Sequence, residues 1–399
     1  MFTSLKHRPF RLFSSGVFVF QTGFEMQNVA LSWFMYQLTG SALALGLMGL
    51  ARVIPVFIFA LIAGHVSDTL PRRRILALAN IVLLITSGIL TSLAFLHLIT
   101  PTIIYLIILI NSTALTFASP ASHAFLPALM PRQDYQNAIS INSMGYKTAM
   151  VIGPAMAGFL IARIGVPGVL ALHIFCIGFY LMSIIRVGRF PQELSHSVHG
   201  KLHSIKAGLR FVKNSRLIWS SMLLDFFASF FGSGMTLMPI FAADILKVGP
   251  EGLGLLYAAP SIGGIIAGLI FTSKKHIKKQ GYVLLISIVF YGVSTIMFGI
   301  STHFSLSLIM MGVVGGADMI SSIIRSTLRQ MVTPDHMRGR MVSINMIFYL
   351  GGPQLGEVES GILASLIGSP YTVVIGGIAT IIATVFFTLR IPELLEYES

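Results

Sequence analysis

Acidic side chains inside apolar stretches are the residues of this sequence best placed to do chemistry. An ionised side chain at the centre of a membrane helix costs about 2.5–3.5 kcal/mol on insertion scales, so each one needs a compensating environment. A carboxylate exposed alternately to either side of a membrane could take up a proton on one side and release it on the other. Five acids are candidates for this proton-coupling role: Glu25, Asp225, Asp318, Glu357 and Glu359.

Glu25 belongs to a stripe of polar residues in the first apolar segment. Gln21 precedes it by four positions, Asn28 follows it by three, and Ser32 comes four further on. On a helix these residues share one face, which we expect to line a cavity. Glu25 and Asn28 are therefore predicted coupling or substrate residues. The alternative is a structural acid that is hydrogen-bonded to Asn28 or to another helix.

Asp225 heads a similar stripe with Ser229, Gly232 and Thr236 in the seventh apolar segment, which we take as the symmetry counterpart of the first. A role parallel to that of Glu25 is expected. Phenylalanines flank Asp225 and could offer their rings to a flat substrate, although such residues more often pack against lipid or neighbouring helices. They are Phe226, Phe227, Phe230 and Phe231.

The other three acids leave two interpretations open. Asp318 shares a helix face with Ser322 and Arg325, which fits either a helix-end network or a transport role. Glu357 and Glu359 are two positions apart and point about 200° from each other on a helix, so at most one faces a given cavity. Either glutamate could form a coupling site or only a hydrogen bond between helices.

Lys147 is a membrane-embedded cation in the fifth segment, where a lysine is costly unless paired or deprotonated. We expect an acid partner, either Glu25 or a carboxylate of the second half. An ion pair broken by substrate or proton would act as a switch, whereas a static pair would be structural.

No metal site, cofactor site or enzyme active site is predicted. His196, His199 and His203 have helical spacing, but they lie among lysines without nearby cysteines, so a solvated helix is the better interpretation. No Ser/His/Asp order or glycine-rich phosphate loop stands out.

The composition of the chain predicts the helices that hold these residues. The chain has 399 residues, of which 55% are hydrophobic and 10% charged, so it cannot build a solvated globular surface. A spanning helix needs about 20 apolar residues. Twelve such segments begin near residues 11, 43, 75, 101, 137, 168, 217, 252, 282, 304, 341 and 370. The sequence therefore predicts an all-α membrane protein with twelve transmembrane helices.

The basic residues are distributed unevenly across these segments. With the N-terminus placed in the cytoplasm, 23 of the 27 lysines and arginines fall on the inner side. Both termini are therefore expected to be cytoplasmic. The same bias accounts for the net charge of +13 without a nucleic-acid partner.

A direct repeat divides the chain into two halves. Residues 131–167 match residues 334–370 at 11 of 37 positions, with a constant offset of 203. Six segments separate the two copies, which indicates parallel repeats of a six-helix bundle. We expect one bundle over residues 1–186, a cytoplasmic linker over 187–216 and a second bundle over 217–399 with a short cytoplasmic tail.

Two motifs now suggest a family. The run from Gly64 through Asp68 to Arg72, Arg73 and Arg74 resembles the loop signature of the major facilitator superfamily. Gly153-Pro154-x-x-x-Gly158 is similar to its antiporter motif. More narrowly, several segments resemble the bacterial branch that holds enterobactin exporters and macrolide efflux pumps: Met26–Trp33, Leu38–Ser41, Pro334 with Arg338–Arg340, and Leu355–Gly361.

The sequence departs from this branch at two places. Phe24 stands before Glu25 where many relatives have a small polar or acidic residue followed by an aromatic one, and Ser122 stands where an arginine is common.

The resemblance implies two pseudo-symmetric bundles of the major facilitator fold, with a central cavity and alternating access. Gly64, Asp68, Arg72 and Arg73 would form a cytoplasmic gate, for which the alternative is that they only fix topology and cap a helix. The expected function is proton-coupled export of a bulky amphipathic small molecule, a siderophore or drug-like compound, by a monomer in a bacterial inner membrane. A lysophospholipid or lipid flippase is the main alternative, and a non-transporting membrane sensor a weaker one.

Overall fold

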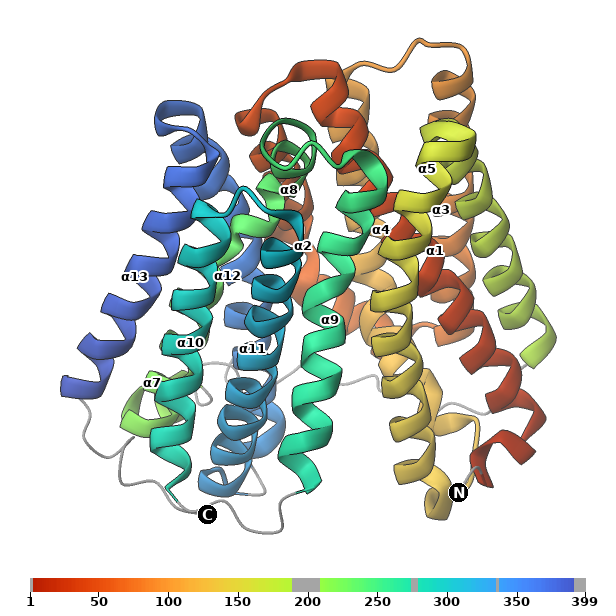
Figure 1. Ribbon diagram of the computed structural model, residues 1–399. Helices are drawn as coiled ribbons and strands as arrows, with labels where there is room; N and C mark the ends of the chain where they lie inside the picture. Colours follow the sequence, from red (N-terminus) through yellow and green to blue (C-terminus); the bar gives the residue numbers. More distant parts are fainter. Residues whose placement is uncertain (1–2, 189–208, 274–278, 335–336, 391–399) are drawn as a thin grey trace. The chain divides into compact units, whose positions relative to one another are not determined.

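The computed structural model of the chain describes residues 3–188, 209–273, 279–334 and 337–390 (Figure 1). Most of the predicted linker, with its three histidines, and the tail after Arg390 lie outside these ranges. The described residues form helices and contain no strand. The predicted all-α membrane fold is confirmed.

The helices follow one another with short connections. The first half contains η1 (Thr3–Lys6), α1 (Arg8–Thr39), α2 (Ala42–Thr69), α3 (Arg72–Phe95), α4 (Pro101–Ala128), η2 (Arg132–Asp134) and α5 (Tyr135–Val187). The second half contains α7 (Arg216–Phe231), η3 (Ser233–Leu237), α8 (Met238–Ile240), η4 (Phe241–Ile245), α9 (Gly249–Ser273), α10 (Gln280–Ile300), α11 (Phe304–Val332), α12 (Arg338–Ile367) and α13 (Ser369–Arg390).

Each of the twelve predicted segments begins within one of these helices. Among the described residues, nine helical stretches are long and apolar enough to cross a membrane, and one of them, Arg132–Val187, has 56 residues. The protein is therefore a multi-pass membrane protein, and the count of twelve crossings stays a prediction.

The long α5 is two helices joined at a sharp bend. Gly165 has a φ of 71°, inside the left-handed region that favours glycine, and Pro167 follows two residues later. Gly368 has a φ of 90° and separates α12 from α13, again two residues before a proline. The two glycines are 203 residues apart, so the repeat found in the sequence also occurs in the backbone.

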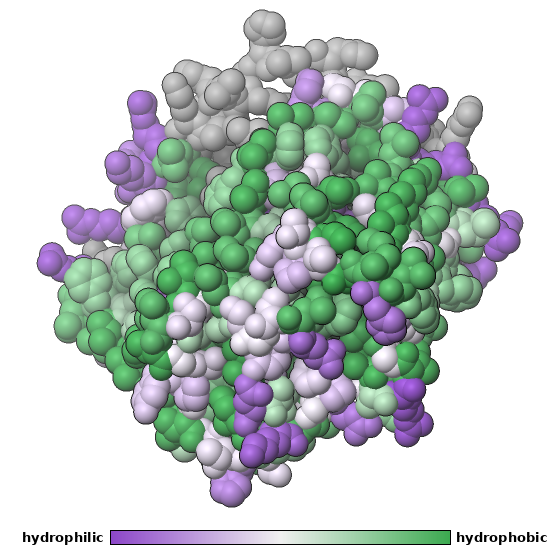
Figure 2. Space-filling view, turned by 90° about the horizontal axis from the view of Figure 1, so that it is seen from above, coloured by the Kyte–Doolittle hydropathy of each residue, from purple (hydrophilic) through white to green (hydrophobic). Residues whose placement is uncertain are grey.

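The outward-facing side chains are largely apolar. Large hydrophobic residues on many helices are strongly exposed, with Phe175 at 72% and Leu366 at 76%. Figure 2, which views the molecule from above, shows hydrophobic side chains over much of this face and hydrophilic ones in separate groups. The strongly exposed apolar side chains along the helices suit contact with lipid.

The helices cluster into two compact units. Unit 1 comprises Met1–Gly40, Ala51–Ser197 and Gly249–Ala258, and unit 2 comprises Ser41–Leu50, Val198–Val248 and Ala259–Ser399. The first part of α2 clusters with unit 2 and the first part of α9 with unit 1, and the predicted division into two bundles stays a prediction. The predicted boundaries assigned each of these helices whole to its own half of the chain.

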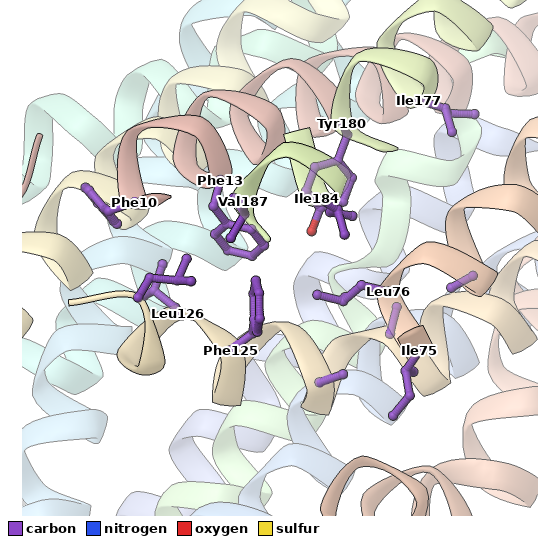
Figure 3. Close-up of a cluster of buried hydrophobic side chains, with 14 of the residues drawn as sticks. Phe10, Phe13, Ile75, Leu76, Phe125, Leu126, Ile177, Tyr180, Ile184 and Val187 are labelled. Carbon is purple, nitrogen blue, oxygen red and sulfur yellow. The ribbon is translucent and has the colours of Figure 1, made fainter. Parts of the chain in front are cut away.

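The core of unit 1 is an aromatic cluster at one end of α1. Phe13 lies with its ring centroid 5.4 Å from that of Phe125 on α4 and 6.0 Å from that of Tyr180 on α5. Figure 3 shows these side chains with Ile184 and Val187, which lie on the same end of α5. Close packing of this kind is what holds helices together in lipid, where burial of apolar area gives little gain.

Unit 2 is built on close contacts between helix backbones. Helix α10 lies beside both α11 and α13 (Figure 1). Gly352 and Gly356 bring α12 against α7 and η3, where the Ser233 hydroxyl donates to the Pro353 carbonyl over 3.0 Å. Small residues allow such contacts in membrane proteins, and hydroxyl groups reinforce them.

Candidate functional site

Glu25 sits within the polar stripe that the sequence predicts for α1. The side-chain amide of Gln21 donates a hydrogen bond of 2.8 Å to the Glu25 carboxylate. Asn28 forms a second hydrogen bond with the same group, and the guanidinium of Arg52 on α2 is close enough to interact with it electrostatically. Glu25 is therefore embedded but has polar partners, which is what an acid in an apolar helix requires.

Gly153, the first glycine of the antiporter-like motif, lies directly against Glu25. A Cβ added to Gly153 would be 2.6 Å from the Glu25 Cβ and 2.8 Å from the Thr22 carbonyl oxygen. Glycine is thus the residue that allows α5 to approach α1 at the level of the acid. The motif and the membrane carboxylate, noted separately in the sequence, form one site.

The second glycine of the motif makes a different crossing. A Cβ added to Gly158 would lie 2.9 Å from the Cα of Gly254 on α9 and would overlap the Pro250 carbonyl oxygen. Pro154 lies in the same crossing, because a Cβ at Gly254 would meet its carbonyl oxygen at 2.5 Å. All three motif residues therefore serve close helix packing within unit 1.

The arginines of the loop signature bind the ends of neighbouring helices. Arg72 donates a 2.9 Å hydrogen bond to the Ala124 carbonyl of α4, and Arg73 donates to the carbonyls of Ile184 and Ile185 on α5 at 3.1 and 2.9 Å. The last carbonyls of a helix carry partial negative charge and lack helical partners, so a cation is favourable there.

The two other residues of the signature differ in their surroundings. Asp68 is half-buried and has a partner, whereas Gly64 has open space around it. The predicted gate between the halves stays a prediction.

The second half contains a charged cluster that the sequence did not reveal as such. Arg325 Nη2 lies 2.9 Å from Asp225 Oδ1 and 3.7 Å from Asp318 Oδ1, and Arg329 Nη1 lies 3.6 Å from Asp225 Oδ2. The four residues come from α7 and α11. The structure therefore brings together two of the predicted acids, Asp225 and Asp318, through Arg325, and Arg329 is a second partner of Asp225.

Arg325 and Arg329 are among the basic residues that the sequence places on the inner side, and this placement stays a prediction. They lie inside α11, and the Arg325 side chain is 2% exposed. The sequence did contain one signal. Asp318, Arg325 and Arg329 are separated by seven and then four positions, which places all three on one face of a helix. Their partner Asp225 could not be inferred, because it lies on another helix.

The predicted stripe on the seventh segment does not continue as a helix. Helix α7 ends at Phe231, and Ser233–Leu237 form a 3₁₀ turn, so Thr236 does not share the face of Asp225. Gly232 marks the break, because an added Cβ would overlap the hydroxyl of Tyr291, which donates to the Gly232 carbonyl over 3.2 Å.

Asp225 is also not the positional counterpart of Glu25. Gly153 contacts Thr22 and Glu25, and the glycine aligned with it in the repeat, Gly356, contacts Phe230 and Ser233. Phe230 follows Thr22 by 208 positions, and Ser233 follows Glu25 by the same number. Ser233 therefore occupies the place equivalent to Glu25. The phenylalanines beside Asp225 stack mainly on one another, with Phe226 and Phe230 at 5.7 Å and Phe227 and Phe231 at 6.0 Å.

The glutamates of α12 have separate surroundings, as their spacing predicts. Glu357 packs against Gly49 on α2, where an added Cβ would lie 2.7 Å from the Glu357 Cβ. Glu359 is half-buried and accepts a 3.4 Å hydrogen bond from its neighbour Ser360. The two acids do not form one shared site.

Lys147 is exposed on α5. Within the described part of unit 1 no ion pair joins it to Glu25, whose partners are Gln21 and Asn28. Its pairing with a second-half acid stays a prediction. The described residues also contain no group of three or more histidine, cysteine or acidic side chains that could hold a metal ion.

Two repeated units of membrane helices, with an acid packed against an antiporter-like glycine motif, fit a transporter of the major facilitator type. The chain belongs to a family within that superfamily: residues 1–399 match the family described as "Transmembrane secretion effector". Its members are transporters and not enzymes.

Named relatives are similar over nearly their whole length. The chain is 24% identical to the multidrug efflux pump Tap of Mycolicibacterium fortuitum, over 92% of this chain and 91% of the pump. It is 25% identical to the enterobactin exporter EntS of Citrobacter koseri, over 98% and 94%. A solved bacterial homologue of the lysosomal transporter Spinster shares the fold, with a TM-score of 0.76, 14% identity and coverage of 98% and 99%.

Proposed function

We propose that this transporter exports a bulky amphipathic small molecule, a siderophore or drug-like compound, in exchange for protons. Glu25 would carry the proton, and the two halves would expose the substrate site to each side in turn. The transporter would work as a monomer in a bacterial cytoplasmic membrane with both termini inside.

The observation that carries this proposal is the contact between Glu25 and Gly153. Burial of the Glu25 carboxyl group disfavours its charged form, whereas the hydrogen bonds from Gln21 and Asn28 favour that form. Its backbone is fixed by the glycine of α5, so a movement of α5 against α1 would change the surroundings of the carboxyl group directly. This arrangement is suited to link proton uptake to a helix movement.

The names of the relatives support the direction and kind of cargo. Tap is named as a drug efflux pump and EntS as a siderophore exporter, and this chain covers more than nine-tenths of each. Under this proposal Asp225, Asp318, Glu357, Glu359, Asn28 and Lys147 would contribute to the substrate path or to coupling. Asp68, Arg72 and Arg73 would close the cytoplasmic side.

A lipid flippase of the same fold is the second candidate, and the exposed apolar side chains of many helices are compatible with it. The test reconstitutes the protein in liposomes and measures flux of enterobactin, erythromycin and lysophosphatidylglycerol under an imposed proton gradient. Proton-dependent flux of either of the first two supports the proposal. Flux of the lysolipid alone supports a flippase, and flux insensitive to the gradient contradicts proton coupling.

Glu25→Gln keeps the size and hydrogen bonding of the side chain but cannot exchange a proton. We expect it to reduce gradient-driven flux at least tenfold while membrane insertion is normal. Glu251→Gln is the matched control, because Glu251 is an exposed acid in the first turn of α9. Normal flux through Glu25→Gln would move the proton site to another carboxylate.

A further inference from the structure

The charged cluster in unit 2 holds more buried positive than negative charge. Arg325 and Arg329 are 2% and 7% exposed and share one well-buried carboxylate, that of Asp225, which is 12% exposed. The second acid, Asp318, is 3.7 Å from Arg325 and 61% exposed, so solvent weakens its effect. Among the residues that the structure describes, the two buried guanidinium groups thus share a single buried counter-charge.

Two donors of Arg325 have no acceptor. Within the described residues, the Nε and Nη1 atoms of Arg325 are buried without a hydrogen-bond partner, whereas Arg329 Nη1 has only its 3.6 Å ion pair with Asp225 Oδ2. Charged donors left unpaired in apolar surroundings are strongly unfavourable. One more anion would therefore balance the excess positive charge and accept hydrogen bonds from the unpaired donors.

Aromatic rings lie beside the cluster. Phe226, next to Asp225, stacks on Phe230 and meets Phe348 edge-on with a centroid distance of 6.3 Å. Tyr291 lies close enough to Arg325 for an electrostatic interaction, and the exposed Tyr349 is similarly close to Asp225 and Asp318. A ligand bound to the arginines would thus meet aromatic surfaces with its apolar part.

We propose that Arg325 and Arg329 form an anion-binding site for an amphipathic aromatic carboxylate. The parallel N–H groups of a guanidinium match the two oxygens of a carboxylate. Asp225 already binds some of these N–H groups and would compete with a bound anion. That this anion is the exported molecule rests on the proposed function. The binding of the anion does not, because binding needs neither a membrane nor a proton gradient.

The test compares two ligands of nearly equal shape, 2-naphthoate and its neutral amide 2-naphthamide. Binding to the purified full-length transporter in detergent is measured by calorimetry. We expect naphthoate to bind at least tenfold more tightly than the amide. Equal affinities for the two compounds, or no binding of naphthoate, would overturn the inference.

Arg325→Met should remove the preference for naphthoate over the amide. Arg163→Met is the matched control, because Arg163 is an exposed arginine on α5 whose guanidinium lies 3.8 Å from the centroid of the Phe159 ring. It should keep the full preference. A retained preference in Arg325→Met contradicts the site.

Asp225→Asn provides a test in case Arg325→Met fails to fold, because it keeps both arginines and removes the competing charge. We expect a lower melting temperature without ligand, about tenfold tighter naphthoate binding, and a larger thermal shift on naphthoate addition than in the wild type. A purely structural ion pair would lower the melting temperature without changing naphthoate affinity, and that result would refute the proposal.

Glu25→Gln separates this inference from the proposed function. It should bind naphthoate with normal preference even though its gradient-driven flux is at least tenfold lower. Normal binding with no proton-dependent flux in the wild type would refute the transport proposal alone. Proton-dependent export without anion preference would refute the binding site alone.

Discussion

Gly49 on α2 lies so close to Glu357 on α12 that a Cβ added to the glycine would be 2.7 Å from the Glu357 Cβ and 2.7 Å from its Oε2. Glu25 has the same relationship to Gly153 in unit 1. In both units the side chain of a membrane glutamate starts in the space that a glycine leaves on the facing helix. The acids are thus placed by helix contacts as well as by their polar partners.

Gly49→Ala should destabilise the protein. The added methyl group overlaps Glu357 and the Gln354 carbonyl oxygen, which lies 2.8 Å from the added atom. Overpacking of this kind costs about 1–3 kcal/mol. Thermal unfolding of the purified protein checks this, with Gly88→Ala as control, because an added Cβ at Gly88 has no neighbour within 4 Å. Equal melting temperatures of the two variants would contradict the contact.

Gly153→Ala should lower both stability and export. The new methyl group pushes α1 away from α5 at Glu25, so we expect a cost of about 1–3 kcal/mol and at least a fivefold loss of flux. Gly178→Ala, in the part of α5 after the bend at Gly165 and with open space around it, is the control. If Gly153→Ala transports normally, the glycine does not position the acid.

Arg73→Met should weaken unit 1, because Arg73 donates to two carbonyl oxygens at the end of α5. Its partial exposure reduces the value of these hydrogen bonds, and we expect a loss of about 1–2 kcal/mol. Arg74→Met removes an exposed arginine next to it and should leave the melting temperature unchanged. A result in which both variants behave alike would argue that Arg73 serves only topology.

Tyr291→Phe removes the hydrogen bond to the Gly232 carbonyl at the end of α7. We expect a loss of about 0.5–1.5 kcal/mol, since one neutral hydrogen bond is removed without changing the packing. Tyr282→Phe, on the exposed face of α10, is the control and should have little effect. A melting temperature of Tyr291→Phe equal to that of the control would mean that the break at Gly232 does not depend on the hydroxyl.

The sequence by itself determined the class of the protein, the approximate start of each apolar helix and the repeat. Hydrophobic runs long enough to cross a bilayer fix helices, because the backbone must satisfy its own hydrogen bonds in lipid. Spacing of three and four residues also predicted that Gln21 and Asn28 share a face with Glu25, and both contact it. These are local properties that a single helix carries in its own sequence.

Only the tertiary structure decided which helices meet. Asp225 and Arg325 are 100 residues apart, and no periodicity within α7 or α11 could pair them. The same holds for Gly153 beside Glu25, Gly49 beside Glu357 and Tyr291 at the end of α7. Helices meet where small residues allow their backbones to pack closely. The spacing of residues along one helix does not show which other helix lies beside it.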